Sequence, residues 1–175
     1  MVLTASLLIG ISILWLWWGQ VTLPPWSLNL STILQAGFLS FVILSLSQIL
    51  YRSWPAYRSY AETYMKLVVT PLAWPDLMLL GILPGLSEEL LFRGVILSAL
   101  GMTWPVILIS NLLFGGLHLL EWRSWPYGVW AMAVGTLMAL GLILTGNLAV
   151  PVLAHMCTNT CSSLLWKWDQ VRQQQ

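Results

Sequence analysis

Six apolar runs occupy most of this sequence, and each comes close to the length of a helix that crosses a membrane. A hydrocarbon core of about 30 Å needs about 20 apolar residues in a helix, and lipid offers no partner for unpaired backbone groups. The runs therefore predict an all-α fold, a polytopic membrane helical bundle with about six transmembrane helices. They lie at 2–18, 31–51, 77–100, 104–120, 127–145 and 148–166.

The composition agrees with a membrane protein and excludes one class of partner. The 175 residues are 58% hydrophobic and 7% charged, whereas an average soluble domain carries about 25% charged residues. The formal net charge is +1 and the sequence has no long basic segment, so nucleic acid is not a predicted partner. The length fits a single integral-membrane domain over 1–175 in contact with the lipid bilayer, and it leaves the oligomeric state open.

The positions of Lys and Arg predict an orientation in the membrane. Short cytoplasmic loops carry an excess of these residues. If both termini are cytoplasmic, the loop cations all face the cytoplasm, while 19–30, 101–104 and 145–147 on the other side contain none. We expect a bacterial-type inner or plasma membrane, or an internal membrane, and a surface helix within 52–75. The loop cations are Arg52, Arg58, Lys66, Arg123, Lys167 and Arg172.

The stretch LSEELLFRGVIL at 86–97 places three charged residues inside an apolar run. One charge at the bilayer centre costs about 2.5–3.5 kcal/mol on insertion scales, so the cluster requires a reason. Glu89 and Arg93 are four residues apart with the acid first, the favourable order for an ion pair within a helix. Glu88 points elsewhere and has no such partner, so its partner is expected from another helix.

Pro84 and Gly85 interrupt the same run just before the charges. A proline inside a helix removes a backbone hydrogen bond, whereas proline in the first turn is well tolerated. We therefore expect a short helical piece over 76–83, followed by a second helix that begins near Pro84 and carries the charged residues.

The sequence has two histidines, and both lie inside predicted spans. His118 follows Phe114 by one helical turn, and Asn159 follows His155 by one turn. Polar residues within spans tend to face the interior of the bundle or a water-filled cavity. We expect Glu88, His118, His155 and Asn159 to share one pocket within a motif-bearing core over 76–168.

Two kinds of hydrolytic chemistry fit these residue types. Glu88, His118 and His155 match a three-ligand zinc site, whose bound water has a pKa of about 7. Without a metal, Glu88 can act on water as a general base while His and Asn159 side chains stabilise the oxyanion. The sequence leaves both versions open, so zinc is a candidate cofactor and not a required one.

Three motifs, in this order, resemble those of the CPBP family, the CAAX proteases and bacteriocin-processing enzymes also called Abi proteins. Residues 88–93 (EELLFR) match the EExxxR motif, 114–118 (FGGLH) match FxxxH, and 155–159 (HMCTN) match HxxxN. The resemblance covers 84–165, about half of the chain, and the ordered trio is more specific than any one motif.

The resemblance implies an intramembrane endopeptidase of the metalloprotease type, whose site opens toward the cytoplasm and whose substrate is a membrane protein or peptide. In this reading Glu88 activates water, and His118 assists it or binds metal. His155 and Asn159 hold the oxyanion or complete a metal site. Whether the substrate is prenylated stays open. The residues expected to support the site are Glu89, Arg93 and Phe114.

Other classes of protein fit some of these residues. A non-catalytic scaffold or immunity protein would keep the protease fold without the reaction. A transporter would also bury charged residues, but the two halves of the sequence show no inverted repeat. A haem protein could use His118 and His155 as axial ligands, but Glu88 and Asn159 would then have no role.

Overall fold

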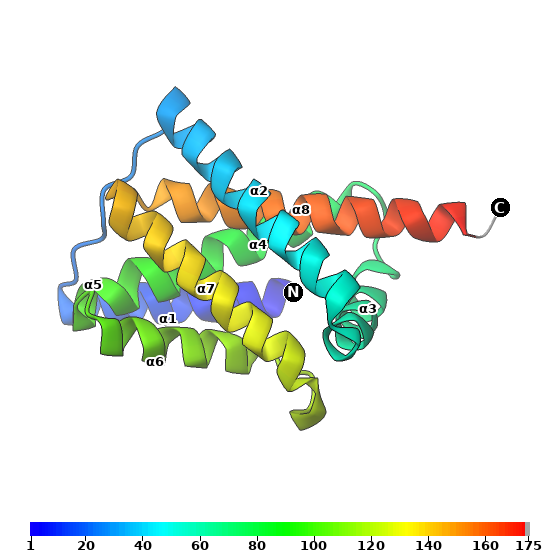
Figure 1. Cartoon of the computed structure of the whole chain (residues 1–175). Helices are drawn as coiled ribbons and strands as arrows, with labels where there is room; N and C mark the ends of the chain where they lie inside the picture. The colour runs from blue at the N-terminus through cyan, green and yellow to red at the C-terminus, as the bar shows by residue number, and fades with distance from the viewer. Residues whose placement is uncertain (174–175) are drawn as a thin grey trace.

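The computed structural model describes residues 1–173, and every regular element in this range is helical (Figure 1). The expected all-α fold is confirmed. In chain order the elements are α1 (Val2–Gly19), α2 (Leu30–Ser53), α3 (Pro55–Val69), α4 (Asp76–Glu89), the π-helix η1 (Leu90–Ile96), α5 (Leu97–Leu100), α6 (Trp104–Leu117), the short 3₁₀ helix η2 (Trp122–Ser124), α7 (Trp125–Thr145) and α8 (Ala149–Arg172).

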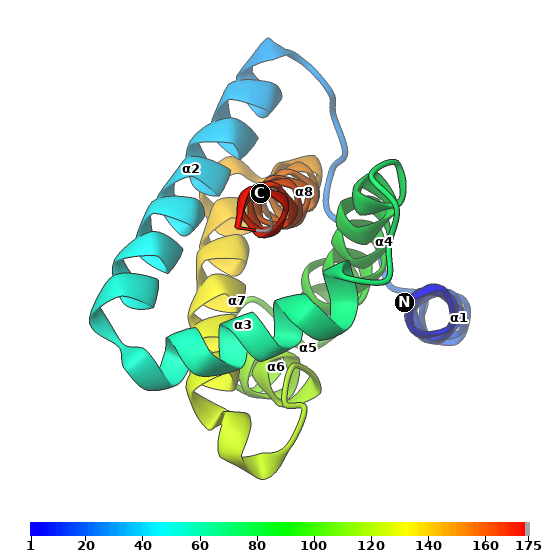
Figure 2. The ribbon, with the colours of Figure 1, turned by 90° about the vertical axis from the view of Figure 1, so that its right-hand side faces the viewer.

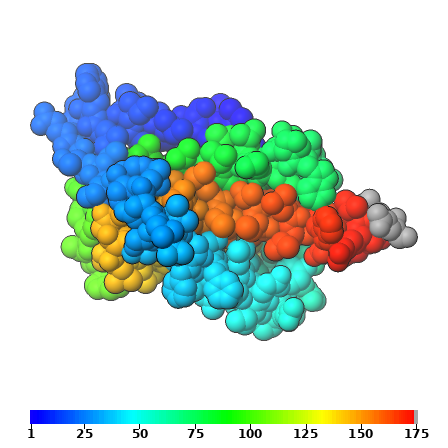
Figure 3. Space-filling model, turned by 90° about the horizontal axis from the view of Figure 1, so that it is seen from above, coloured from blue at the N-terminus to red at the C-terminus, as the bar shows by residue number. Residues whose placement is uncertain are grey.

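Helix α8 occupies the middle of the bundle. In Figure 2, which looks nearly along its axis, α2, α7 and α4 surround it. Its most extensive contacts are with α4 and α2, and Figure 3 shows α8 in orange between these two neighbours. Helix α1 lies on the outer side of α4, where it contacts α4 and η1.

Small residues allow α4 and α8 to pack closely. A Cβ atom added at Gly85 would lie 2.5 Å from Met156 Cγ, and one added at Gly81 would overlap Thr160 Oγ1. Small residues at such seams let helix backbones approach each other, which is the usual basis of helix association in membranes. The α4–α8 seam is therefore fixed by backbone geometry as well as by side chains.

The expected break at Pro84 is wrong. Helix α4 continues from Asp76 to Glu89 with Pro84 inside it, so one helix carries both the segment 76–83 and the two glutamates. The close contacts of Gly81 and Gly85 with α8 lie on either side of the proline, so tertiary packing accompanies the helical backbone at this point. The irregular backbone lies after the glutamates, in η1.

Three helical segments are long and apolar enough to cross a membrane, and α6 is apolar but shorter. The three are Val2–Gly19, Leu30–Ser53 and Trp122–Thr145. Many large apolar side chains on the outer faces of the helices are exposed, among them Trp18, Phe38 and Leu144, as expected for helices that face lipid. The chain is thus indicated to be an integral membrane protein; the six-span count and the cytoplasmic termini stay predictions.

The expected helix within 52–75 is present as α3, which connects α2 to α4 (Figure 2). Its aromatic side chains pack on the start of α7. The rings of Tyr57 and Tyr64 stack on Tyr127 with centroid distances of 6.2 and 4.8 Å. Contacts of this kind hold α3 against one end of the bundle.

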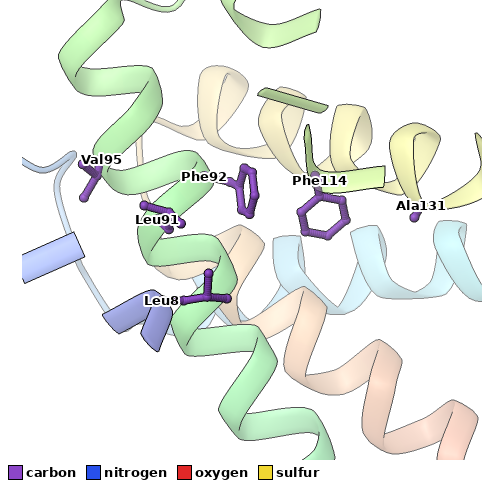
Figure 4. Close-up of a cluster of buried hydrophobic side chains, with 6 residues drawn as sticks. All are labelled: Leu8, Leu91, Phe92, Val95, Phe114 and Ala131. Atoms are coloured by element: carbon purple, nitrogen blue, oxygen red, sulfur yellow. The ribbon is translucent and has the colours of Figure 1, made fainter. Parts of the chain in front are cut away.

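One cluster of buried apolar side chains links four elements beside the charged residues. Figure 4 shows Phe92 of η1 and Phe114 of α6 facing each other, with a centroid distance of 5.2 Å and nearly perpendicular rings. Leu8 reaches the cluster from α1, and Ala131 from α7. The full cluster is Leu8, Leu91, Phe92, Val95, Phe114 and Ala131.

Candidate active site

The predicted pair of Glu89 and Arg93 is present, and both side chains are fully buried. Arg93 Nη1 donates to Glu89 Oε1 at 3.1 Å. Glu89 ends α4 and Arg93 lies in η1, and π-helical turns of this kind are frequent at functional sites. The pairing lowers the cost of burying both charges, which is high for either one alone.

The other side of the Arg93 guanidinium is held by α6 and α7. Its Nη2 donates to the Gly135 carbonyl at 2.6 Å and to Asn111 Oδ1 at 3.2 Å. Sequence reasoning did not identify either partner. Asn111 carried a usable signal, because it is an isolated amide in the apolar stretch ILISNLLF; a backbone carbonyl such as that of Gly135 leaves no signal.

His155 of α8 binds the same carboxylate. Its Nδ1 lies 2.8 Å from Glu89 Oε1, and because an ionised carboxylate only accepts, Nδ1 carries the proton. The other ring nitrogen, Nε2, is left without a proton in the neutral imidazole. It lies 4.0 Å from Glu88 Oε2.

His118 presents its ring in the same way from another direction. The residue directly follows the last turn of α6, where its Nδ1 donates to the Phe114 carbonyl at 2.8 Å. A carbonyl oxygen only accepts, so Nδ1 again carries the proton. His118 Nε2 lies 3.8 Å from Glu88 Oε2.

Glu88 is the point where the two histidines meet. Its Oε2 is buried and makes no hydrogen bond to any protein atom among residues 1–173, while both imidazole Nε2 atoms stand at nearly equal distances from it. The glutamate side chain as a whole is 15% exposed. The structure therefore brings together three of the four residues that were expected to converge: Glu88, His118 and His155.

Phe114 packs against each part of this cluster. Its ring centroid lies 4.7 Å from that of His118 and 6.2 Å from that of His155, and the Arg93 Cζ lies 4.5 Å from its centroid. The aromatic face thus contacts the guanidinium in a cation–π arrangement. The supporting role expected of Phe114 stays a prediction.

Asn159 lies on α8 one turn beyond His155 and is partly buried. Its backbone carbonyl accepts from Ser163 Oγ. Within the described part of the chain, no hydrogen bond links its side chain to the other three residues. A role for Asn159 stays a prediction.

The charge of Glu88 affects the pKa of Tyr64 in α3. Burial, and in second place the negative charge of Glu88, raise the pKa of the Tyr64 phenol above its usual value. Both causes disfavour the phenolate. The end of the bundle that α3 covers is therefore electrostatically linked to the site.

The donors fit zinc by their chemistry and hydrogen bonding. Histidines that bind metal through Nε2 usually donate Nδ1–H to a carboxylate or a backbone carbonyl, as His155 and His118 do. No group of three His, Cys, Asp or Glu side chains within 1–173 is closed enough to hold a metal ion. The Glu88–histidine separations of 3.8 and 4.0 Å exceed by a few tenths of an ångström the spacing that bonds of about 2.0–2.2 Å imply.

Comparison with known proteins decides the family. The profile of the Rce1-like type II CAAX prenyl endopeptidases matches residues 70–161, a range that contains all three motifs. The chain belongs to this family. The resemblance noted from the motifs is confirmed, and family membership indicates a protease.

The chain is also similar to a protein of a bacterium. The chain is 26% identical over 151 residues to uncharacterized protein YpbD of Bacillus subtilis (strain 168), an alignment that covers 86% of this chain and 77% of that protein. No solved structure matches the chain. Together with the candidate spans, the Rce1-like family assignment indicates a protease embedded in a membrane.

Proposed function

We propose that this protein is an intramembrane endopeptidase that hydrolyses a peptide bond of a membrane-associated protein or peptide with water activated by Glu88. One observation carries the proposal: Glu88 Oε2 has no protein hydrogen-bond partner in the described chain, and two imidazole Nε2 atoms face it at 3.8 and 4.0 Å. The neighbouring Glu89 binds Arg93 and His155 through Oε1; its Oε2 is also without a hydrogen-bond partner, but the side chain is fully buried. Glu88 is 15% exposed and faces both imidazoles, so it is the better placed of the two carboxylates to act on water.

In the proposed reaction Glu88 is the general base. Its carboxylate takes a proton from water as the water oxygen bonds to the carbonyl carbon of the substrate, and the carbonyl becomes an oxyanion. The protonated Glu88 then gives that proton to the amide nitrogen as the carbon–nitrogen bond breaks. Proton transfers of this type contribute about 10²–10⁴ in rate.

The histidines orient the reactants. The hydrogen bonds at Nδ1 fix both rings so that each Nε2 points toward Glu88. A neutral Nε2 accepts a hydrogen bond from the water, and a protonated Nε2 donates to the oxyanion. Zinc, when bound by Glu88, His118 and His155, would supply a lowered water pKa and polarisation of the substrate carbonyl.

Asn159 is proposed as a further donor to the oxyanion. It lies one turn beyond His155 on α8, and the hydrogen bond that it makes within 1–173 outside the helix ladder is from Ser163 to its backbone carbonyl. A donor preorganised where charge develops stabilises the transition state more than the ground state.

We also propose that the site faces the cytoplasm in a six-span arrangement, on the basis of the Lys and Arg distribution.

Comparison of membrane proteomes tests the proposal. Cells that contain the wild type, Glu88→Gln or His118→Ala at equal folded yield are compared for new protein N-termini. We expect one set of cleavage products to be absent in both variants. Asp169→Asn is the matched control, because it makes the same carboxylate-to-amide change at an exposed position of α8 and should cleave as the wild type does. If all cleavage products persist in both site variants, the protease proposal is wrong and a scaffold role replaces it.

A further inference from the structure

Asn111 is a buried amide in the middle of an apolar helix, and both ends of its side chain are paired. Its Oδ1 accepts from Arg93 Nη2 at 3.2 Å, and its Nδ2 donates to Thr136 Oγ1 of α7 at 3.0 Å. The Thr136 hydroxyl in turn donates to the Met132 carbonyl at 2.9 Å. Since Asn111 is 2% exposed, water cannot replace these partners.

The two acceptors on Nη2 fix the direction of the whole guanidinium. Guanidinium is planar, so holding Nη2 between Asn111 Oδ1 and the Gly135 carbonyl also sets where Nη1 points. Gly135 makes this close approach feasible: an added Cβ would lie 2.7 Å from both Arg93 Nη2 and Asn111 Oδ1. Arg93 is therefore aimed at Glu89 by residues of α6 and α7.

The same Glu89 oxygen that receives Arg93 also receives His155. Oε1 lies 3.1 Å from Arg93 Nη1 and 2.8 Å from His155 Nδ1. Both donors meet at one oxygen, so the place of Arg93 also fixes where Glu89 presents the acceptor that His155 faces. An acceptor at that place favours the proton on His155 Nδ1, so the tautomer and orientation of His155 depend on where Arg93 is held.

We propose that Asn111, supported by Thr136, is a positioning residue that sets the tautomer and orientation of His155 through Arg93 and Glu89. The inference rests on the proposed function, in which His155 Nε2 must face Glu88. In this proposal Asn111 of α6 and Thr136 of α7, which lie outside the three motifs, also help to position the site.

His118 offers an internal reference for this relay. Its Nδ1 donates to the Phe114 carbonyl within its own chain segment, and this bond does not pass through Arg93 or Glu89. A change at Asn111 should therefore act on His155 and leave the ring of His118 unchanged. General loosening of the bundle would affect both rings.

The experiment uses the full chain in lipid nanodiscs with ¹⁵N-labelled histidine. The chain has two histidines, so ring ¹⁵N shifts report each tautomer without crowding, and His118→Gln assigns the signals. In the wild type we expect both rings to carry the proton on Nδ1. Asn111→Leu should give His155 a mixture of tautomers, Thr136→Val a smaller change in the same direction, and Thr136→Ser the wild-type spectrum because it retains the hydroxyl.

Ser110→Ala is the matched control, because Ser110 is the adjacent buried polar residue of α6 and has no part in the relay. Wild-type His155 shifts in both Asn111→Leu and Thr136→Val would overturn the inference, as would equal changes at the two histidines.

In the proteome comparison, Asn111→Leu should lower cleavage by about 10–100-fold, the range typical of partners that orient an active-site ligand. If Glu88→Gln cleaves normally the proposed function fails, whereas normal cleavage by Asn111→Leu with Glu88→Gln inactive refutes only the relay.

Discussion

Glu88 and Glu89 are adjacent in sequence but lie on two different sides of the site. The closed side consists of Glu89, Arg93, Asn111 and the Nδ1 edge of His155, and its charged groups are buried and paired. The open side consists of Glu88 and His118, whose side chains are 15% and 17% exposed. One carboxylate therefore binds the groups that hold the site together, and the proposed chemistry falls to the other, more exposed one.

The strongest test of this comparison removes the cation of the closed side. Arg93→Ala leaves Glu89 buried beside a histidine without its main partner, and loss of one member of a buried pair costs about 3–5 kcal/mol of unfolding free energy. Glu88→Ala should cost much less, because Glu88 has no cation partner to strand. Thermal unfolding of both variants in the same detergent measures this, and equal melting temperatures would contradict the division into two sides.

The closed side should also be sensitive to added volume at Gly135. Gly135→Ala places a methyl group 2.7 Å from Arg93 Nη2 and Asn111 Oδ1, and overpacking a filled interior costs about 1–3 kcal/mol. Gly116→Ala is the matched control, because a Cβ there meets no atom within 4 Å. Chemical denaturation of the two variants gives the difference, and an undisturbed Gly135→Ala would show that the guanidinium is loosely held.

Phe114 joins the two sides, so its removal should weaken both moderately. Phe114→Leu loses the perpendicular contact with Phe92 and the cation–π contact with Arg93, together worth about 1–2 kcal/mol. Phe41→Leu, at a position of α2 that is 65% exposed, should be nearly neutral. The unfolding free energies of the pair check this expectation, and a neutral Phe114→Leu would mean that the ring only fills space.

The smallest expected effect reports the charge of the open side. Glu88→Gln should lower the pKa of Tyr64 only in part, because burial is the larger cause of its elevation and the Glu88 charge is the second. The phenolate becomes easier to form when the nearby negative charge is removed. Titration of ¹³C-labelled tyrosines, with Tyr64→Phe for assignment, measures the change. An unaltered Tyr64 pKa in Glu88→Gln would mean that the Glu88 carboxylate does not act on the phenol.

Local spacing predicted some of these contacts well. The pairing of Glu89 with Arg93 follows from their separation by one helical turn, and the scarcity of polar residues in apolar runs pointed to both histidines. The Gly135 carbonyl and the bond from His155 to Glu89 could not be predicted, because they depend on how separate helices are rotated and shifted against each other.

The errors and open points in the fold have similar causes. Proline chemistry alone predicted a break at Pro84, but α4 is continuous there and packs closely on α8 at Gly81 and Gly85, a contact that local sequence does not reveal. Nothing in the residues 90–96 distinguishes a π-helix from an α-helix. Hydropathy alone indicated six spans, whereas three of the described helical segments combine sufficient length and apolarity and α6 is apolar but shorter; α4 has 14 residues because η1 follows it directly.

The π-helix has a consequence for how this site tolerates changes in chain length. A π-helical hydrogen bond spans one residue more than an α-helical one, so deletion of a single residue within Leu90–Ile96 can be absorbed by a change to regular α-helix. The turns before and after the deletion would then keep their relative rotation. A deletion in the regular part of α4 would instead rotate the residues on its two sides by about 100° relative to each other, so η1 is the part of this helix where a change in chain length turns the two carboxylates least.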